Sequence, residues 1–136
     1  MIVYFDTSAL VPILIEEPCS LAAALLWDEA DRVISSRVAY AEARAALAMA
    51  RRSNRVNDDE LRKVVDDFEL LHEQLDIVEV NDRLIRDAGS LADQFGLRAY
   101  DAVHLASARV VQDPDLVLAA GDQNLLRAAQ GLGFAM

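Results

Sequence analysis

Short apolar runs alternate with longer stretches of helical spacing along the chain. Four runs, at residues 2–5, 32–35, 77–80 and 116–119, are rich in β-branched residues and bounded by polar turns. Runs of this length and composition are typical of strands buried on both faces, as in a parallel sheet covered by helices. The pattern therefore predicts strands at these four places.

Helical spacing of apolar residues fills the segments between the strands. After Asn57, for example, apolar residues recur three and four positions apart, and acids fill the opposite face. Asn57 and Glu60 have the spacing of a capping box, and Gly96 is placed to end a later helix. The predicted helices span residues 9–15, 20–31, 38–52, 58–75, 82–95, 102–111 and 123–130, and a short last strand is expected at Phe134.

Length and composition bound the class of protein. Alternating strands and helices over 136 residues favour a single α/β domain, residues 1–136, with a mainly parallel sheet. The only cysteine, Cys19, excludes an intrachain disulfide and a thiolate metal cluster. The first residues lack the basic region of a signal peptide, and no apolar run is long enough to cross a bilayer. We therefore expect a cytoplasmic protein with no membrane segment.

The formal net charge of −10 narrows the choice of partners. It argues against a sequence-independent binder of duplex DNA, which neutralises phosphates with a basic face, and against an anionic membrane surface as partner. It leaves open an enzyme that holds divalent cations and contacts a nucleic acid locally.

Two acids stand at the carboxyl ends of predicted buried strands, the edge at which open α/β sheets bind ligands. Asp6 follows the first strand, and Asp122 follows the last of the four. Each also has a purely structural interpretation, because an aspartate at this position can cap the helix that follows.

Two further acids lie where the apolar pattern does not favour them. A rotation of about 100° per residue places Glu42 on the apolar face of its helix with Val38, Ala45 and Met49. Asp101 introduces a helix that is apolar almost all round. A buried carboxylate needs a cation, a donor or a proton, and an arginine elsewhere in the fold could supply it for Glu42. If Glu42 has no such partner, Glu42→Gln should raise the metal-free melting temperature.

These four acids together suggest a metal site. Two carboxylates about 4 Å apart repel by roughly 4 kcal/mol at an effective dielectric constant near 20. A cluster of four would therefore need cations. Oxygen ligands without cysteine select Mg²⁺ or Mn²⁺, and such sites carry out phosphoryl chemistry.

Four segments resemble the PIN-domain proteins, and in particular the VapC toxins of type II toxin–antitoxin modules. They are the first ten residues, MIVYFDTSAL, the pair Ala41-Glu42, the segment YDAVHLA at 100–106, and GDQNLLRAA at 121–129 followed by GLG at 131–133. The resemblance runs from end to end, and the four segments occur in the family's order.

The resemblance implies a three-layer α/β/α fold with a central five-stranded, mainly parallel sheet, and a Mg²⁺-dependent endoribonuclease in which Mn²⁺ substitutes. The family's acidic site maps onto Asp6, Glu42, Asp101 and Asp122 as catalytic and metal-binding residues, with Asp6 and Asp101 as the foremost metal ligands. Its hydroxyl position falls on Thr7 and Ser8, which are expected to support the site. The resemblance further implies a single-stranded or structured RNA substrate, a homodimer and a VapB-type antitoxin.

Other functions remain open at this point. The chain could be a PIN-fold RNA-processing nuclease outside a toxin–antitoxin system, a phosphatase with Asp6 as its nucleophile, or an interaction domain without catalysis. The phosphatase family of that kind carries a second aspartate where Ser8 stands. His104 is interpreted as a core residue outside the site, and Arg98 and Arg127 as weak candidates for phosphate contacts.

Overall fold

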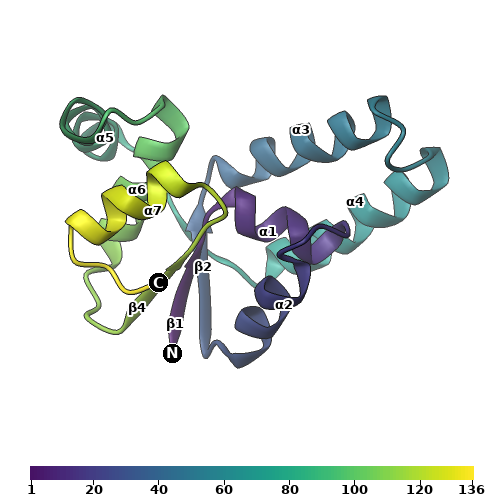
Figure 1. Ribbon diagram of the computed structural model, residues 1–136, viewed down its shortest axis with the longest axis horizontal. Coiled ribbons are helices and arrows are strands. Elements are labelled where there is room, and N and C mark those ends of the chain that lie inside the picture. The colour runs from purple at the N-terminus through teal and green to yellow at the C-terminus, as the bar shows by residue number, and fades with distance from the viewer.

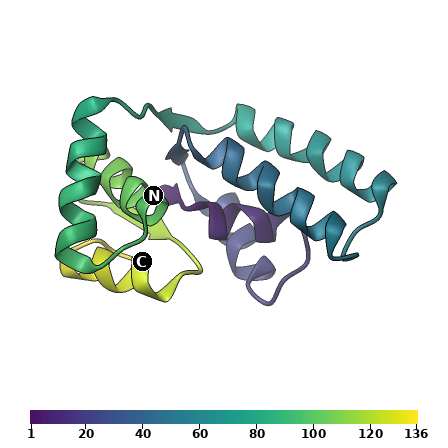
Figure 2. The ribbon, with the colours of Figure 1, turned by 90° about the horizontal axis from the view of Figure 1, so that it is seen from above.

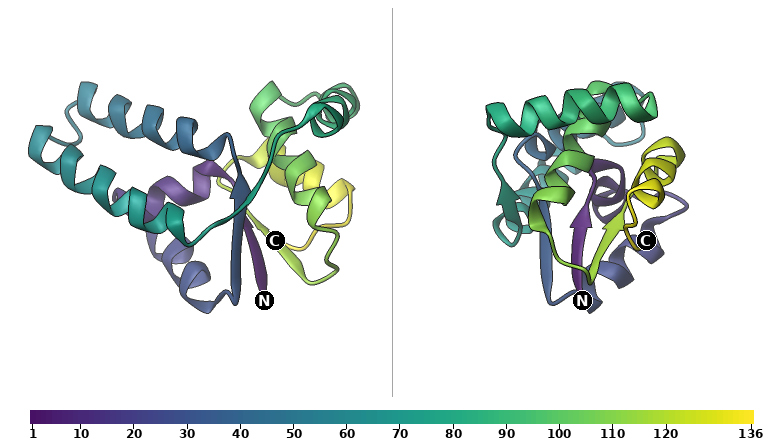
Figure 3. Two further views of the ribbon diagram at one scale, coloured as in Figure 1. Left: turned by 180° about the vertical axis from the view of Figure 1, so that it is seen from behind. Right: turned by 90° about the vertical axis from the view of Figure 1, so that its left-hand side faces the viewer.

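The computed structural model describes residues 1–136 and contains one sheet of four parallel strands. The strands are β1 (Ile2–Phe5), β2 (Arg32–Ser36), β3 (Asp76–Val78) and β4 (Leu116–Ala119). Their order across the sheet is β3-β2-β1-β4, so the first strand of the chain lies inside the sheet, between β2 and β4. All four strands run in the same direction, and their carboxyl ends lie at one edge (Figure 3).

Seven helices form the outer layers. Helices α1 to α4 cover one face of the sheet, and α5 to α7 cover the other (Figure 1). This is the predicted α/β/α arrangement. The helices are α1 (Thr7–Leu14), α2 (Ser20–Glu29), α3 (Ala39–Arg52), α4 (Asp58–Glu73), α5 (Asp82–Phe95), α6 (Ala99–Val111) and α7 (Gln123–Gly131). None of the helices combines the length and the apolarity needed to cross a membrane.

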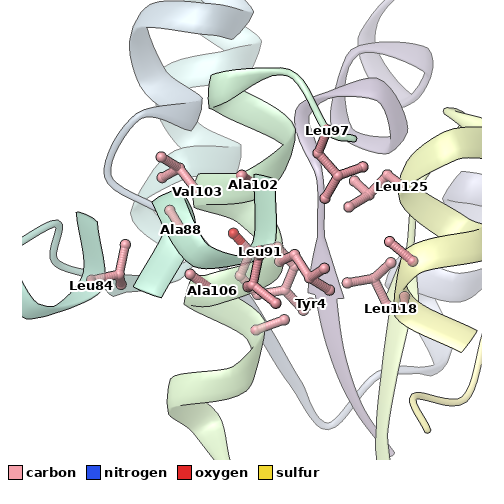
Figure 4. Close-up of a cluster of buried hydrophobic side chains, with 14 of the residues drawn as sticks. Tyr4, Leu84, Ala88, Leu91, Leu97, Ala102, Val103, Ala106, Leu118 and Leu125 are labelled. Atoms are coloured by element: carbon pink, nitrogen blue, oxygen red, sulfur yellow. The ribbon is translucent and has the colours of Figure 1, made fainter. Parts of the chain in front are cut away.

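The side chains of β1 alternate between two hydrophobic cores, one on each face of the sheet. Val3 and Phe5 pack against α1, α3 and α4, whereas Tyr4 packs against α5, α6 and α7. Figure 4 shows Tyr4 among side chains of the core on the α5–α7 face, including Leu91 and Leu118. All three strand residues are fully buried, as expected for a central strand covered on both faces.

Helices α3 and α4 form a hairpin that projects away from the sheet (Figure 2). The predicted capping box is present at the start of α4, where the Asn57 side chain accepts from the Glu60 N–H and the Glu60 side chain accepts from the Asn57 N–H. Within the hairpin the Tyr40 and Phe68 rings pack with their centroids 5.5 Å apart.

Two differences from the sequence-based expectation concern the last strand and the start of α6. The sheet has four strands instead of five, because the residues after the Gly133 turn make only one isolated bridge, between Val117 and Ala135. Helix α6 begins at Ala99, three residues earlier than expected, because Arg98 in an extended conformation takes the N-cap position. Asp101 therefore lies in the first turn of α6, where the helix dipole favours an acid.

Candidate active site

The four candidate acids lie at the carboxyl edge of the sheet, each on a different element. Asp6 follows β1 directly and caps α1, because its side chain accepts from the Ser8 N–H at 3.1 Å. Asp122 caps α7 by accepting from the Leu125 N–H at 2.9 Å. Glu42 and Asp101 lie in the first turns of α3 and α6. The cap interpretation of Asp6 and Asp122 is therefore correct, and it is compatible with a place in the site.

Glu42 borders the buried face of α3 instead of lying in its middle. The buried residues of this helix are Ala39, Ala43, Leu47 and Ala50, so the face is rotated by about one residue from the predicted one. Met49, which was expected on the buried face, is exposed. The sequence of this segment shows the helical period of its apolar residues clearly. It defines poorly which way the apolar face of the helix points. The Glu42 side chain is 26% exposed.

His104 on α6 joins two of the four acids. Its Nε2 atom lies 2.6 Å from Glu42 Oε1 and 3.3 Å from Asp6 Oδ1. The imidazole is fully buried, so it is held between these carboxylates and the core. His104 is a buried, hydrogen-bonded core residue, as expected, and it also contacts two of the candidate acids, which was not predicted from the sequence. The signal was present in the sequence, because His104 lies one helical turn after Asp101.

The electrostatics of this group follow from burial and from mutual attraction. Burial alone would lower the pKa of His104, but the hydrogen bond to Glu42 and the negative charges of Asp6, Glu42 and Asp101 together raise this pKa above its ordinary value of 6.5. Burial alone would raise the pKa of Glu42, but the hydrogen bond and charge of His104, with the hydrogen bond from Thr7, lower it. The partner of Glu42 is a histidine, not the arginine considered from the sequence.

Tyr4 and Thr7 fix the orientation of this group from two sides. The Tyr4 hydroxyl lies 2.8 Å from His104 Nδ1, the ring nitrogen opposite the carboxylates. The Thr7 hydroxyl donates to Glu42 Oε1 at 2.8 Å and lies 3.3 Å from His104 Nε2. Burial raises the pKa of Tyr4 well above its ordinary value, so its hydroxyl keeps its proton.

Ser8 ties the end of β1 to the loop that follows β4. Its hydroxyl donates to Asp6 Oδ2 and accepts from the Gly121 N–H at 2.8 Å. A Cβ atom on Gly121 would lie 3.4 Å from the Ser8 carbonyl oxygen, so the two segments approach closely. This link holds Asp6 beside the loop that carries Asp122.

Arg98 joins the other two acids. Its Nε donates to Asp101 Oδ2 at 3.0 Å, and its Nη2 donates to Asp122 Oδ2 at 3.1 Å. Burial raises the pKa of Asp101 above its ordinary value, and the charges of Asp122 and Asp6 add to the rise although Arg98 opposes it. The hydrogen bond and charge of Arg98 therefore do not outweigh burial together with the two neighbouring acids.

The site therefore consists of two linked groups at one edge, Asp6–His104–Glu42 and Asp101–Arg98–Asp122. No three side chains among the Asp, Glu, His and Cys residues are already grouped closely enough to hold one metal ion. The two groups are nevertheless adjacent, because Ser8 bonds both Asp6 and the N–H of Gly121, which directly precedes Asp122. Carboxylates of this kind can hold a hard divalent cation, hold water or accept a proton.

Known proteins resemble this chain in both sequence and structure. The PIN domain family matches residues 3–131. Ribonuclease VapC45 of Mycobacterium tuberculosis is 44% identical over 132 residues, which cover 97% of this chain and 92% of that protein. The structure resembles M. tuberculosis VapC20, a toxin that cleaves the sarcin–ricin loop, with a TM-score of 0.71 and 17% identity over 98% of this chain and 96% of that one. It also resembles a toxin–antitoxin complex from Klebsiella pneumoniae, with a TM-score of 0.67 and 16% identity over 98% and 95% of the two chains.

Proposed function

The chain belongs to the PIN-domain family and, within it, to the VapC-type ribonucleases of toxin–antitoxin systems, and from this premise we propose that it is a divalent-metal-dependent endoribonuclease whose active site is the group of four acids. The observation that carries the proposal is that acids from four elements come together only in the folded chain. His104 contacts Asp6 and Glu42. Arg98 contacts Asp101 and Asp122.

The donor set fits a hard divalent cation. Asp6, Asp101 and Asp122 offer carboxylate oxygens, and the lone cysteine, Cys19, is exposed and outside both site groups. The unbalanced negative charge at Asp101 is what such a cation would compensate. We infer that Asp6, Asp101 and Asp122 hold Mg²⁺, for which Mn²⁺ would substitute. When bound, the ion supplies a water of lowered pKa and positive charge beside the phosphodiester.

Glu42 and His104 have a different role in this proposal. Glu42 Oε1 is taken by His104 and Thr7, whereas Glu42 Oε2 accepts no hydrogen bond from the protein. The free oxygen can accept a proton from water, and the bound one keeps the carboxylate oriented. His104 places a buried partner beside Asp6 and so holds that carboxylate at the rim of the site.

Single-stranded RNA is the substrate class that this arrangement favours. An open site at the end of a sheet reaches a flexible backbone more readily than a regular duplex, and loops present their phosphates and bases freely. VapC20, which shares the fold, cleaves an RNA loop. The phosphatase alternative is disfavoured, because Ser8 stands where the phosphatase family of that kind carries its second aspartate.

A protein partner follows from the same family membership. The fold matches a chain of a toxin–antitoxin complex. We propose that this chain acts as the toxin of such a pair, is bound by a VapB-type antitoxin, and forms a homodimer. The PIN-fold RNA-processing nuclease outside a toxin–antitoxin system has no specific observation in its favour.

Asp6→Asn tests the proposal directly. Removing the Asp6 charge while retaining its shape should reduce Mg²⁺-dependent cleavage of a fluorescent single-stranded RNA by at least about 100-fold, because one ligand of the cation loses its charge. The folded state should persist, since asparagine is as good a helix cap as aspartate. Circular dichroism would check the fold and a fluorescence assay the cleavage.

Asp59→Asn is the matched control. Asp59 lies in the first turn of α4, far along the hairpin, and its side chain is 87% exposed. This variant should cleave RNA like the wild type. Cleavage that continues undiminished in excess EDTA, or in Asp6→Asn, would contradict the metal mechanism.

A further inference from the structure

Arg98 is the one cation that contacts both Asp101 and Asp122. Two different nitrogens of its guanidinium take one carboxylate each, at 3.0 and 3.1 Å. The arginine brings one positive charge to two negative ones, so the group keeps a net negative charge. A divalent cation in the same place would balance both carboxylates.

The guanidinium and a metal ion compete for the same oxygens. Carboxylate oxygens bound to Mg²⁺ lie about 2.0–2.1 Å from it, closer than any hydrogen-bond donor approaches. Both Oδ2 atoms are now directed at Arg98. Asp122 Oδ1 already accepts from the Leu125 N–H, so an ion that binds both acids through their Oδ2 atoms requires the guanidinium to leave the space between them.

Arg98 and His104, the two basic side chains of the site, differ in exposure. The Arg98 side chain is 79% exposed, whereas the His104 side chain has no exposed surface. An exposed arginine can rotate into water at little cost, since surface ion pairs are weak. His104 is enclosed by the core and fixed by Tyr4, so it stays between Asp6 and Glu42.

We propose that Arg98 is an exchangeable internal counter-ion: it holds Asp101 and Asp122 together in the metal-free protein and is displaced when a divalent cation binds them. The inference rests on the proposed metal site, and it concerns this chain's own arginine.

The test compares Mn²⁺ binding to metal-free wild type, Arg98→Ala and Arg98→Lys by calorimetry. Arg98→Ala has no guanidinium to displace. It should bind Mn²⁺ about tenfold more tightly than the wild type, because binding no longer costs two weak ion pairs. Arg98→Lys should lie between the two, because an ammonium keeps the charge but lacks the planar fork that spans two carboxylates. The Mn²⁺-induced rise in melting temperature should follow the same order.

Arg62→Ala is the matched control. Arg62 pairs with Asp59 at the same three-residue spacing and is similarly exposed, but it lies on α4 away from the sheet edge. Arg62→Ala removes the same charge from the molecule as Arg98→Ala and should leave the Mn²⁺ affinity at the wild-type value. An equal gain in Arg62→Ala and Arg98→Ala would reduce the effect to net charge and overturn the proposal.

The outcomes separate this inference from the function on which it rests. If the wild type binds Mn²⁺ and Arg98→Ala binds it no more tightly, the counter-ion role is wrong while the metal site stands. If neither protein binds Mn²⁺, even at millimolar concentration, the metal site itself is wrong and the inference fails with it.

Discussion

At the scale of single residues, the site depends on how each buried charge is balanced. His104 is fully buried, and its pKa is nevertheless raised, because the hydrogen bond to Glu42 and the nearby carboxylates outweigh the cost of burial. Glu42→Gln was expected to be stabilising only if Glu42 had no partner. The hydrogen-bonded His104–Glu42 pair rules out that condition. A carboxylate that has a buried cationic partner stabilises the fold, and losing its charge leaves the partner unbalanced.

Glu42→Gln should therefore lower the free energy of unfolding of the metal-free protein, by about 1.5–3 kcal/mol at pH 6, the usual range for a hydrogen bond to a charged group. The contribution of His104 is complete below its unfolded pKa, near 6.5, and is lost as pH rises through the higher folded value. That of Glu42 is present above its unfolded pKa, near 4.5, and is lost as pH falls through the lower folded value. The pair thus stabilises most between these limits.

Urea unfolding of wild type and Glu42→Gln in EDTA, at pH 6 and pH 9, would measure this effect. The difference between the two proteins should be larger at pH 6, where the wild-type histidine is protonated. Glu69→Gln serves as a control for the pH dependence, because the Glu69 carboxylate contacts Arg44 and Tyr40 in the hairpin and lies outside the site. A variant more stable than wild type at pH 6 would contradict the His104 pair.

At the scale of elements, helix starts decide which side chains reach the site. Gly96 ends α5 in the left-handed conformation with φ of 66°, which glycine adopts without strain. The chain then turns into α6 within three residues, and this short connection places Arg98 ahead of the helix and Asp101 in its first turn. The geometry of one connection thus sets the Asp101–Arg98–Asp122 group.

Helix α4 shows the opposite case, an element whose start affects stability but not the site. Asn57→Ala removes the side-chain acceptor of the capping box and should lower the free energy of unfolding by about 1 kcal/mol, the usual value of an N-cap. Asn57→Asp retains an acceptor and should restore most of the loss. Thermal unfolding would measure both, and RNA cleavage should be unchanged in each. Lost cleavage in the folded Asn57→Ala protein would show that the start of α4 contributes to the site.

At the scale of the whole molecule, the sheet couples two separate cores. Leu47 belongs to the core beneath α3 and Leu105 to the core beneath α6, and both are fully buried. Because β1 contributes side chains to both cores, loss of packing on either face should weaken the same strand. We therefore expect one cooperative unfolding transition for the entire chain.

Leu47→Ala and Leu105→Ala test this coupling. Each should lower the free energy of unfolding by about 2–5 kcal/mol, the range for truncating a buried leucine. Trp27, the only tryptophan, packs on Phe5 with ring centroids 5.3 Å apart, on the face opposite Leu105. In Leu105→Ala, the midpoint by Trp27 fluorescence should fall as far as the midpoint by far-UV circular dichroism. A fluorescence midpoint that stays at the wild-type value would indicate two independent units.

The sequence by itself determined the elements and the edge at which the acids lie. Strand composition, helical spacing and the Asn57 and Gly96 signals predicted the order of strands and helices, and four acids emerged as misfits to that order. These signals act between residues that are close along the chain, within a turn of helix or a few positions of strand. They can therefore be recognised in the sequence without knowledge of the fold.

Only the tertiary structure decided how the charges are paired. His104 meets Glu42 across 62 positions of sequence and Tyr4 across 100, and Arg98 meets Asp122 across 24. The rotation of α3, the early start of α6 and the single bridge in place of a fifth strand also depend on packing between distant segments. Periodicity predicts that a side chain is buried. The identity of its partner depends on which surfaces the fold brings together, since electrostatic pairing acts through space and not along the chain.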